Sequence, residues 1–216
     1  MRTNLIRNAA LTAAGLAFTG GAIAGPVTAA HAAPTQGKPT TVAQDRKNGE
    51  RELGVRYEAQ PNFYYCGPAA ARNALSVQGK NIDVDTMAKQ MGTTEAGTNS
   101  INDITPVLNK QTGKDAYQSV EIRQAKADDK QTDTLRTDIT KAIDEGHAVV
   151  ANIAGTATDT DGGVHSFEGG HYISVVGYRD NGHTVTIADS ADPAQASYRM
   201  SIDNLADWIA TRGYTA

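Results

Sequence analysis

Apolar residues recur at helical spacing in the first part of the chain that carries a clear pattern. The alanine-rich residues 66–77 predict a helix that ends near Gly79. A short helix is expected around Met87 and Met91, and a longer one from about residue 100 to its stop at Gly113. The front of the folded part is therefore predicted to be helical.

The pattern then changes to strands, with an amphipathic helix among them. Leu135, Ile139 and Ile143 fall on one face of a helix expected over residues 132–145, and a last helix is expected over 202–211. Runs rich in β-branched residues predict strands at residues 117–122, 148–153, 172–178, 184–188 and near Tyr198. Helices followed by antiparallel strands predict an α+β fold, with a helical front lobe and an antiparallel β-sheet back lobe.

The stretch from Gly155 to Gly170 is long and acidic, and we interpret it as a mobile loop. A lid and a calcium-binding loop are the alternatives for this segment.

Residues 1–32 have the features of a bacterial-type export signal. Arg2 and Arg7 form a positive start, the apolar stretch from Ala9 to Ala24 follows, and Ala30-His31-Ala32 fits a small-x-small cleavage site. A retained membrane anchor is the alternative, but the stretch is short and interrupted by Gly and Thr. We therefore expect a secreted protein with a flexible arm over residues 33–52 and one domain over residues 53–216.

The charge balance limits the partners. The predicted signal holds two of the 20 basic residues and none of the 24 acidic ones, so its removal leaves a net charge of −6. Nucleic acids and anionic lipids bind basic surfaces, so we expect neither as a partner. We expect a monomer.

Cys66 is the only cysteine in the sequence, so it has no partner for an intramolecular disulfide. It stands where an aromatic loop meets the first predicted helix, and Pro68 suits the first turn of that helix. The helix dipole and the free N–H groups of a first turn favour negative charge on the sulfur. The position therefore suits a nucleophile, and an inert buried cysteine is the alternative.

Gln60 precedes Cys66 by six residues, in a loop that could fold back toward the sulfur. Its side-chain amide and the backbone N–H of Cys66 would then donate to a developing oxyanion. A solvated loop residue is the alternative interpretation of Gln60.

His171 follows two glycines and opens an apolar strand, which makes it the candidate base among the histidines. We expect its competitors, His147, His165 and His183, to be exposed.

The residue that orients His171 is either Asp189 or Asp192. A three-residue hairpin loop, Asp180-Asn181-Gly182, would pair Arg179 with His183 and set His171 and Asp189 on the same side as diagonal neighbours. A two-residue turn would bring Asp192 opposite His171 instead. We favour Asp189, because Asp192 precedes a proline, where strand pairing should end.

Three motifs carry a family resemblance: Gln60 with Cys66-Gly67-Pro68-Ala69-Ala70, Gly170-His171-Tyr172-Ile173-Ser174-Val175-Val176-Gly177-Tyr178, and Ile187-Ala188-Asp189-Ser190. Together they resemble the C39-like cysteine peptidases, relatives of the papain fold, over about residues 54–212. The resemblance implies that Cys66 is the nucleophile, His171 the general base, Asp189 its orienter and Gln60 the oxyanion donor. The better-known members cut leader peptides on transporters, whereas this chain resembles a stand-alone, secreted branch. The family tends to have proline after its aspartate, which keeps Asp192-Pro193 open as the third position.

The sequence therefore predicts a secreted cysteine peptidase that needs no cofactor or metal. Three alternatives stay open: a catalytically silent module of the same fold that binds peptides, acyl transfer to an amine in place of hydrolysis, and a zinc site made by Cys66, His171 and Asp189. The module's groove would be rimmed by Phe63, Tyr64 and Tyr65.

Overall fold

The computed structural model describes residues 49–216, which all belong to one compact unit, Pro39–Ala216. The predicted export signal, residues 1–32, and most of the predicted arm, residues 33–52, lie outside the described residues. Among residues 49–216, no helix has the length and apolar character that crossing a membrane requires.

Three helices form the front of the fold: α1 (Cys66–Ser76), α2 (Val84–Met91) and α3 (Ile101–Thr112). Asp83 caps α2 by accepting from the backbone N–H of Thr86, and Ser100 caps α3 in a capping box with Asp103. Both α2 and α3 end at a glycine in the left-handed region. The predicted helical front is confirmed.

The strands of the back form a single antiparallel sheet in the order β2-β7-β3-β4-β5-β6, and β1 pairs with β4. The strands are β1 (Arg51–Glu52), β2 (Ser119–Glu121), β3 (Val149–Thr158), β4 (Val164–Arg179), β5 (Thr184–Ala188), β6 (Ser197–Ser201) and β7 (Gly213–Thr215). Two further helices, α4 (Asp129–Asp144) and α5 (Ile202–Ile209), lie between the strands, as do two short 3-10 turns, Asp180–Gly182 and Pro193–Gln195. The predicted α+β class, with helices before an antiparallel sheet, is confirmed.

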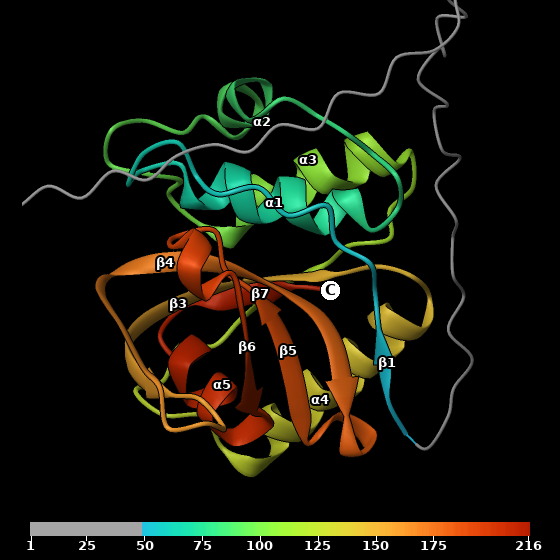
Figure 1. Cartoon of the computed structure of the whole chain (residues 1–216), viewed down its shortest axis with the longest axis vertical. Helices are drawn as coiled ribbons and strands as arrows, with labels where there is room; N and C mark the ends of the chain where they lie inside the picture. The colour runs from blue at the N-terminus through green and yellow to red at the C-terminus, as the bar shows by residue number, and fades with distance from the viewer. Residues whose placement is uncertain (1–48) are drawn as a thin grey trace, which may run out of the picture. The chain divides into compact units, whose positions relative to one another are not determined.

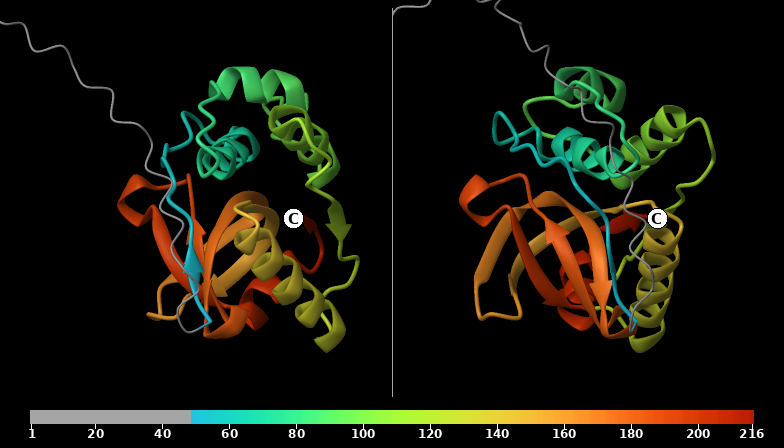
Figure 2. Two further views of the ribbon diagram at one scale, coloured as in Figure 1. Left: turned by 90° about the vertical axis from the view of Figure 1, so that its right-hand side faces the viewer. Right: turned by 45° about the vertical axis from the view of Figure 1, so that its right-hand side comes forward.

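The sheet is buried on both faces, and each face has its own core. Along β3, Val149, Ala151 and Ile153 pack with α4 and α5, whereas Val150 packs with α1, α2 and α3. Figure 1 shows α1, α2 and α3 together above the sheet, and Figure 2 shows the same separation from two other sides. The alternation along β3 is the strand period of two, which explains how one strand serves two cores.

Residues 155–170 are not a mobile loop, which corrects the expectation from the sequence. They extend β3 and β4 into one long hairpin, in which Thr158 pairs with Val164. The carboxylate of Asp159 closes the turn by accepting from the backbone N–H groups of Asp161 and Gly163.

The sheet also begins earlier than the predicted domain boundary at residue 53. Arg51 and Glu52 pair with Tyr178 and Gly177 of β4, so the end of the predicted arm is part of the fold. Gly177 has no side chain because one would collide with the backbone of Arg51 and Glu52.

Candidate active site

Cys66 is the first residue of α1 and is 8% exposed. No side chain caps this helix, so its first N–H groups remain available to an incoming oxygen atom. The next residue must be glycine, since a Cβ at Gly67 would lie 2.4 Å from Oγ1 of Thr98. The helix start is thus packed tightly against the loop before α3.

A hydrogen bond fixes α1 to the strand that carries His171. The hydroxyl of Ser174 in β4 donates to the carbonyl oxygen of Ala70 at 2.7 Å, and both residues are buried. Ala70 lies one helical turn beyond Cys66, and Ser174 lies three residues beyond His171. The bond therefore ties the two elements together close to both residues.

The imidazole of His171 is hydrogen-bonded to an acid and interacts electrostatically with Cys66. Its Nε2 lies 2.7 Å from Oδ1 of Asp189. Burial lowers the pKa of His171, but the hydrogen bonds and charges of Asp189 and Cys66 outweigh burial and raise the pKa to about 9. Because Nε2 faces Asp189, the other ring nitrogen, Nδ1, is the one left for the sulfur. The imidazole is therefore charged at neutral pH.

Asp189 is almost fully buried and its carboxylate is held from three sides. Oδ1 also accepts from the backbone N–H of Ala191 at 2.9 Å, and Oδ2 accepts from the hydroxyl of Tyr198 at 2.9 Å. Burial raises the pKa of Asp189, yet its bonds to His171, Ala191 and Tyr198 bring the pKa below its ordinary value. A charged carboxylate therefore faces a charged imidazole.

Asp192 lies elsewhere. It is exposed and accepts from the backbone N–H of Ala194, which caps the short turn Pro193–Gln195. Between the two aspartates considered from the sequence, the structure brings only Asp189 to His171.

The predicted turn between β4 and β5 is wrong, although it led to Asp189. Arg179 pairs with Thr184, so four residues form the loop, and Asp180 and Asn181 adopt positive φ angles. A bulge between Val175 and Gly177 then shifts the register by one residue. Beyond the bulge, Val175 pairs with Ile187 and Ser174 with Ala188, which is the register that the expected three-residue loop would give.

Gln60 lies beside the residue that follows Asp189. Its backbone N–H donates to the carbonyl oxygen of Ser190 at 2.9 Å, and the hydroxyl of Ser190 donates to Oε1 of Gln60 at 3.1 Å. Nε2 of Gln60 donates to the carbonyl oxygen of Asn62 at 3.0 Å. The loop before α1 is thus attached to the β5 side of the site, with the amide held in one orientation.

The aromatic loop before Cys66 exposes one large apolar side chain. Phe63 is 81% exposed, and its ring meets the ring of Tyr64 edge to face, as Tyr64 meets Tyr65.

Aromatic rings from the β3–β4 hairpin cover the back of the pair formed by His171 and Asp189. Phe167 stacks on His171 with ring centroids 4.1 Å apart, and His165 stacks on Tyr198 with centroids 3.8 Å apart. His165 is buried and its Nε2 lies 2.9 Å from Oδ2 of Asp159, which corrects the expectation that it is exposed. The sequence offered a signal, because His165 and Phe167 alternate with the polar Ser166 and Glu168, as in a strand.

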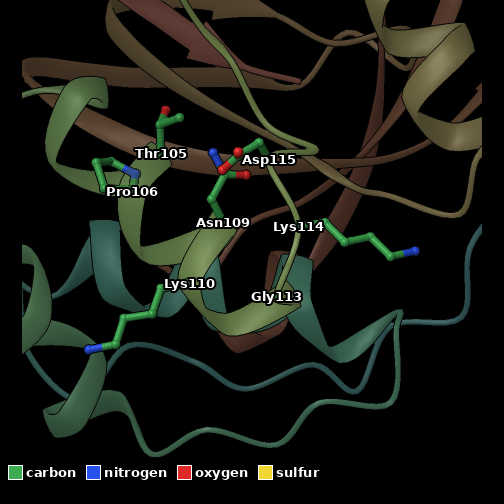
Figure 3. Close-up of a pocket in the computed structure, with 7 residues that line it drawn as sticks. All are labelled: Thr105, Pro106, Asn109, Lys110, Gly113, Lys114 and Asp115. Atoms are coloured by element: carbon green, nitrogen blue, oxygen red, sulfur yellow. The ribbon is translucent and has the colours of Figure 1, made fainter.

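An open pocket is lined by residues of α3 and of the segment directly after it (Figure 3), and none of the candidate catalytic residues lines it. Asn109, one of the lining residues, uses its amide to bind both backbone groups of Tyr117, so its role there is structural. Lys110 and Lys114 point away from each other, so their charges do not converge on a ligand.

Zinc binding by Cys66, His171 and Asp189 was one alternative from the sequence. Within residues 49–216, the structure contains no group of three or more His, Cys, Asp or Glu side chains that could hold a metal ion.

Solved structures provide a comparison for the fold. A Bacillus anthracis protein described as C39-like is 12% identical, with a TM-score of 0.50, and the match covers 76% of this chain and 96% of that one. The peptidase domain of Streptococcus ComA, a bifunctional ABC transporter of a quorum-sensing pathway, is 20% identical, with a TM-score of 0.49 and coverage of 73% and 93%. A double-glycine-motif protease from an AMS/PCAT transporter, solved with its leader peptide, is 12% identical, with a TM-score of 0.44 and coverage of 76% and 91%.

Sequence comparison gives the family. No curated protein sequence matches the chain. The sequence model of the Peptidase_C39 like family matches residues 52–216, which is most of the chain. This match supports a peptidase-type function, and the chain belongs to the Peptidase_C39 like family.

Proposed function

We propose that this protein is an exported cysteine peptidase that hydrolyses amide bonds with Cys66 as nucleophile, His171 as proton carrier and Asp189 as the group that orients His171. One observation carries the proposal: a single buried imidazole is hydrogen-bonded to a carboxylate and interacts electrostatically with the cysteine at the start of a helix. This is the arrangement that an activated thiol nucleophile needs.

The charge state of His171 sets the first step. With its pKa raised to about 9, the imidazole is protonated at neutral pH, and its charge acts on the sulfur of Cys66. Asp189 compensates this charge from the other side of the ring. In the proposed mechanism the sulfur reacts as a thiolate paired with this imidazolium.

The reaction then proceeds in two halves. The thiolate of Cys66 attacks the carbonyl carbon, and the π electrons move onto the carbonyl oxygen. As the C–N bond breaks, the imidazolium of His171 gives its proton to the departing amine, which leaves a thioester. Neutral His171 next takes a proton from water, whose oxygen attacks the thioester. The C–S bond breaks, the acid is released, and the ion pair is restored.

The developing oxyanion needs donors that are already in place. The backbone N–H of Cys66 lies at the uncapped start of α1, and the amide of Gln60 is fixed by Ser190 and Asn62. We assign these two groups to the oxyanion, since the loop that holds Gln60 leads directly into α1.

Export belongs to the same proposal and rests on the sequence of residues 1–32. A lone thiol sent outside the cell is more readily explained by chemistry than by disulfide formation. The substrates are accordingly peptides or proteins outside the cell.

The test compares three proteins: wild type, Cys66→Ala and His171→Ala. Wild type should cleave members of a broad peptide library, and iodoacetamide should alkylate Cys66 at pH 6 faster than it alkylates a model thiol. Both variants should lose cleavage. Peptide binding that survives both substitutions, with no cleavage by wild type, would favour the silent binding module.

A further inference from the structure

Arg212 brings a cation to the neighbourhood of His171. It is the residue before β7, and its guanidinium lies against Gly170, where a Cβ would be 3.3 Å from Nη2 of Arg212. Gly170 has φ +92° and directly precedes His171 in β4. A side chain at position 170 would therefore be strained and would meet the guanidinium. The glycine leaves room for this cation next to the proposed base.

The charge of Arg212 also acts on Tyr172, a residue on which the charge of Cys66 acts as well. The hydroxyl of Tyr172 donates to the carbonyl oxygen of Thr98 and accepts from the amide of Asn152. Burial and the charge of Cys66 raise the pKa of Tyr172, whereas the charge of Arg212 acts in the opposite direction. In the sheet, Asn152 pairs with Gly213, the residue after Arg212. Arg212 and Cys66 thus both lie within electrostatic range of the hydroxyl of Tyr172.

Arg212 has no partner of its own in the part of the chain that the structure describes. It is partly buried, yet its guanidinium forms no ion pair and no hydrogen bond there. The carboxylates on neighbouring elements are engaged elsewhere. Asp103 caps α3, Glu121 pairs with Arg123, and Glu168 accepts from the hydroxyl of Thr156.

We propose that Arg212 forms an anionic subsite that binds an acidic side chain of the peptide substrate close to the scissile bond. A guanidinium presents paired N–H donors that match the two oxygens of a carboxylate, and a partly buried setting strengthens the bond. The inference rests on the proposed function, because it names the substrate class of that same site.

The experiment uses pairs of short fluorogenic peptides that differ only in Glu versus Gln at one position, scanned across the residues around the scissile bond. Wild type should prefer Glu at one position by about 10-fold in kcat/KM. Arg212→Gln should remove this preference, and Arg212→Lys should keep part of it. The ratio of the two rates is the readout, so a general loss of activity does not mimic the effect.

Arg199→Gln is the matched control, since Arg199 is exposed on β6, at the other end of the sheet from β7. It should keep the preference of wild type. The preference should also weaken as salt is added, because a bond between charged groups is screened.

A second measurement separates this inference from the proposed function. Binding of the same uncleaved peptide pairs is measured with Cys66→Ala protein, with and without Arg212→Gln. Cleavage with equal rates for Glu and Gln peptides overturns the acidic subsite and leaves the peptidase in place. Binding that depends on Glu and on Arg212, without any cleavage by wild type, refutes the proposed peptidase activity and supports the subsite. If wild type cleaves none of the peptides, equal binding of both members of every pair, or no binding at all, overturns the subsite.

Discussion

The hydroxyl of Tyr198 donates a hydrogen bond of 2.9 Å to Oδ2 of Asp189, whose other oxygen faces His171. Tyr198 belongs to β6, an edge strand, and its ring stacks on His165 of the long hairpin. His165 in turn is bound by Asp159 at the tip of that hairpin. The carboxylate beside the proposed base is thus supported by an element that the sequence did not connect with the site.

Replacing Tyr198 with Phe should move the acid limb of kcat/KM to higher pH. The hydroxyl of Tyr198 lowers the pKa of Asp189, so its removal raises that pKa. Leaving Oδ2 of a buried carboxylate without a donor should also cost about 1–3 kcal/mol of stability at pH 7. A carboxyl group whose pKa is lowered by folding stabilises the folded state only at pH values where it is ionised. The cost of the substitution should therefore shrink as the solution is acidified.

Tyr214→Phe is the control for Tyr198→Phe, because the hydroxyl of Tyr214 also donates to a carboxylate, that of Asp138. It should affect stability without moving the pH profile of activity. An acid limb that stays in place in Tyr198→Phe would contradict the assigned role of Asp189.

Asp189→Asn should lower the pH at which activity is lost on the alkaline side. Asp189 raises the pKa of His171 through its hydrogen bond and its charge, so a neutral amide lets that pKa fall from about 9. The imidazolium that protonates the leaving amine would then be lost at lower pH. The alkaline limb of kcat/KM measures the shift. Asp192→Asn, at the exposed cap, should keep the wild-type profile; the reverse result would place the orienting carboxylate at Asp192.

Gln60→Ala should reduce kcat by about 10²–10³-fold with a small change in KM, as expected for loss of an oxyanion donor. The donor acts mainly on charge that develops in the transition state, so binding of the substrate is less affected. Gln195→Ala, on the exposed turn before β6, serves as the control. An equal loss in both variants, or a change confined to KM, would refute the oxyanion role.

The charged pair should make stability depend on pH in the alkaline range. The pKa of His171 is raised from its ordinary 6.5 to about 9, so its contribution is fully present below about pH 6.5 and is lost as pH rises through about 9. Chemical denaturation between pH 6 and pH 10 should show this loss in wild type. His171→Gln should flatten the profile over that window, and an unchanged slope would count against the raised pKa.

Much of the fold could be predicted because local signals agree with it. The amphipathic pattern of Leu135, Ile139 and Ile143 places α4, which the structure extends to Asp129–Asp144. Strands β1 and β7 were not predicted, for two different reasons. β7 has only three residues, and β1 pairs with the far end of β4, so neither carries a periodic signal of its own. For residues 155–170, the Gly and Asp residues predict a loop more strongly than the alternation around His165 predicts a strand, although that histidine is buried.

Site residues could be predicted where a chemically reactive side chain stands at a position that a local sequence pattern marks. Cys66 stands at a helix start, as expected, whereas His171 lies inside β4 and does not open the strand, because the β3–β4 hairpin extends the strand back to Val164. Asp189 could only be argued from strand register, which depends on a bulge that no residue pattern announces. Tyr198 and Phe167 were missed because their contacts arise from tertiary packing of the long hairpin and β6.

At the bulge between Val175 and Gly177, β4 has one residue more than β5. The carbonyl of Val176, the residue left over by the shift, is used by the N–H of Leu53. Deleting one residue from the loop after Arg179 could be absorbed by straightening the bulge, which confines the disturbance to the outer half of the hairpin. An insertion would only lengthen the loop, because the pairs from Arg179–Thr184 to Ser174–Ala188 do not depend on its length. Single-residue length changes in this loop should therefore leave Asp189 beside the imidazole in either direction.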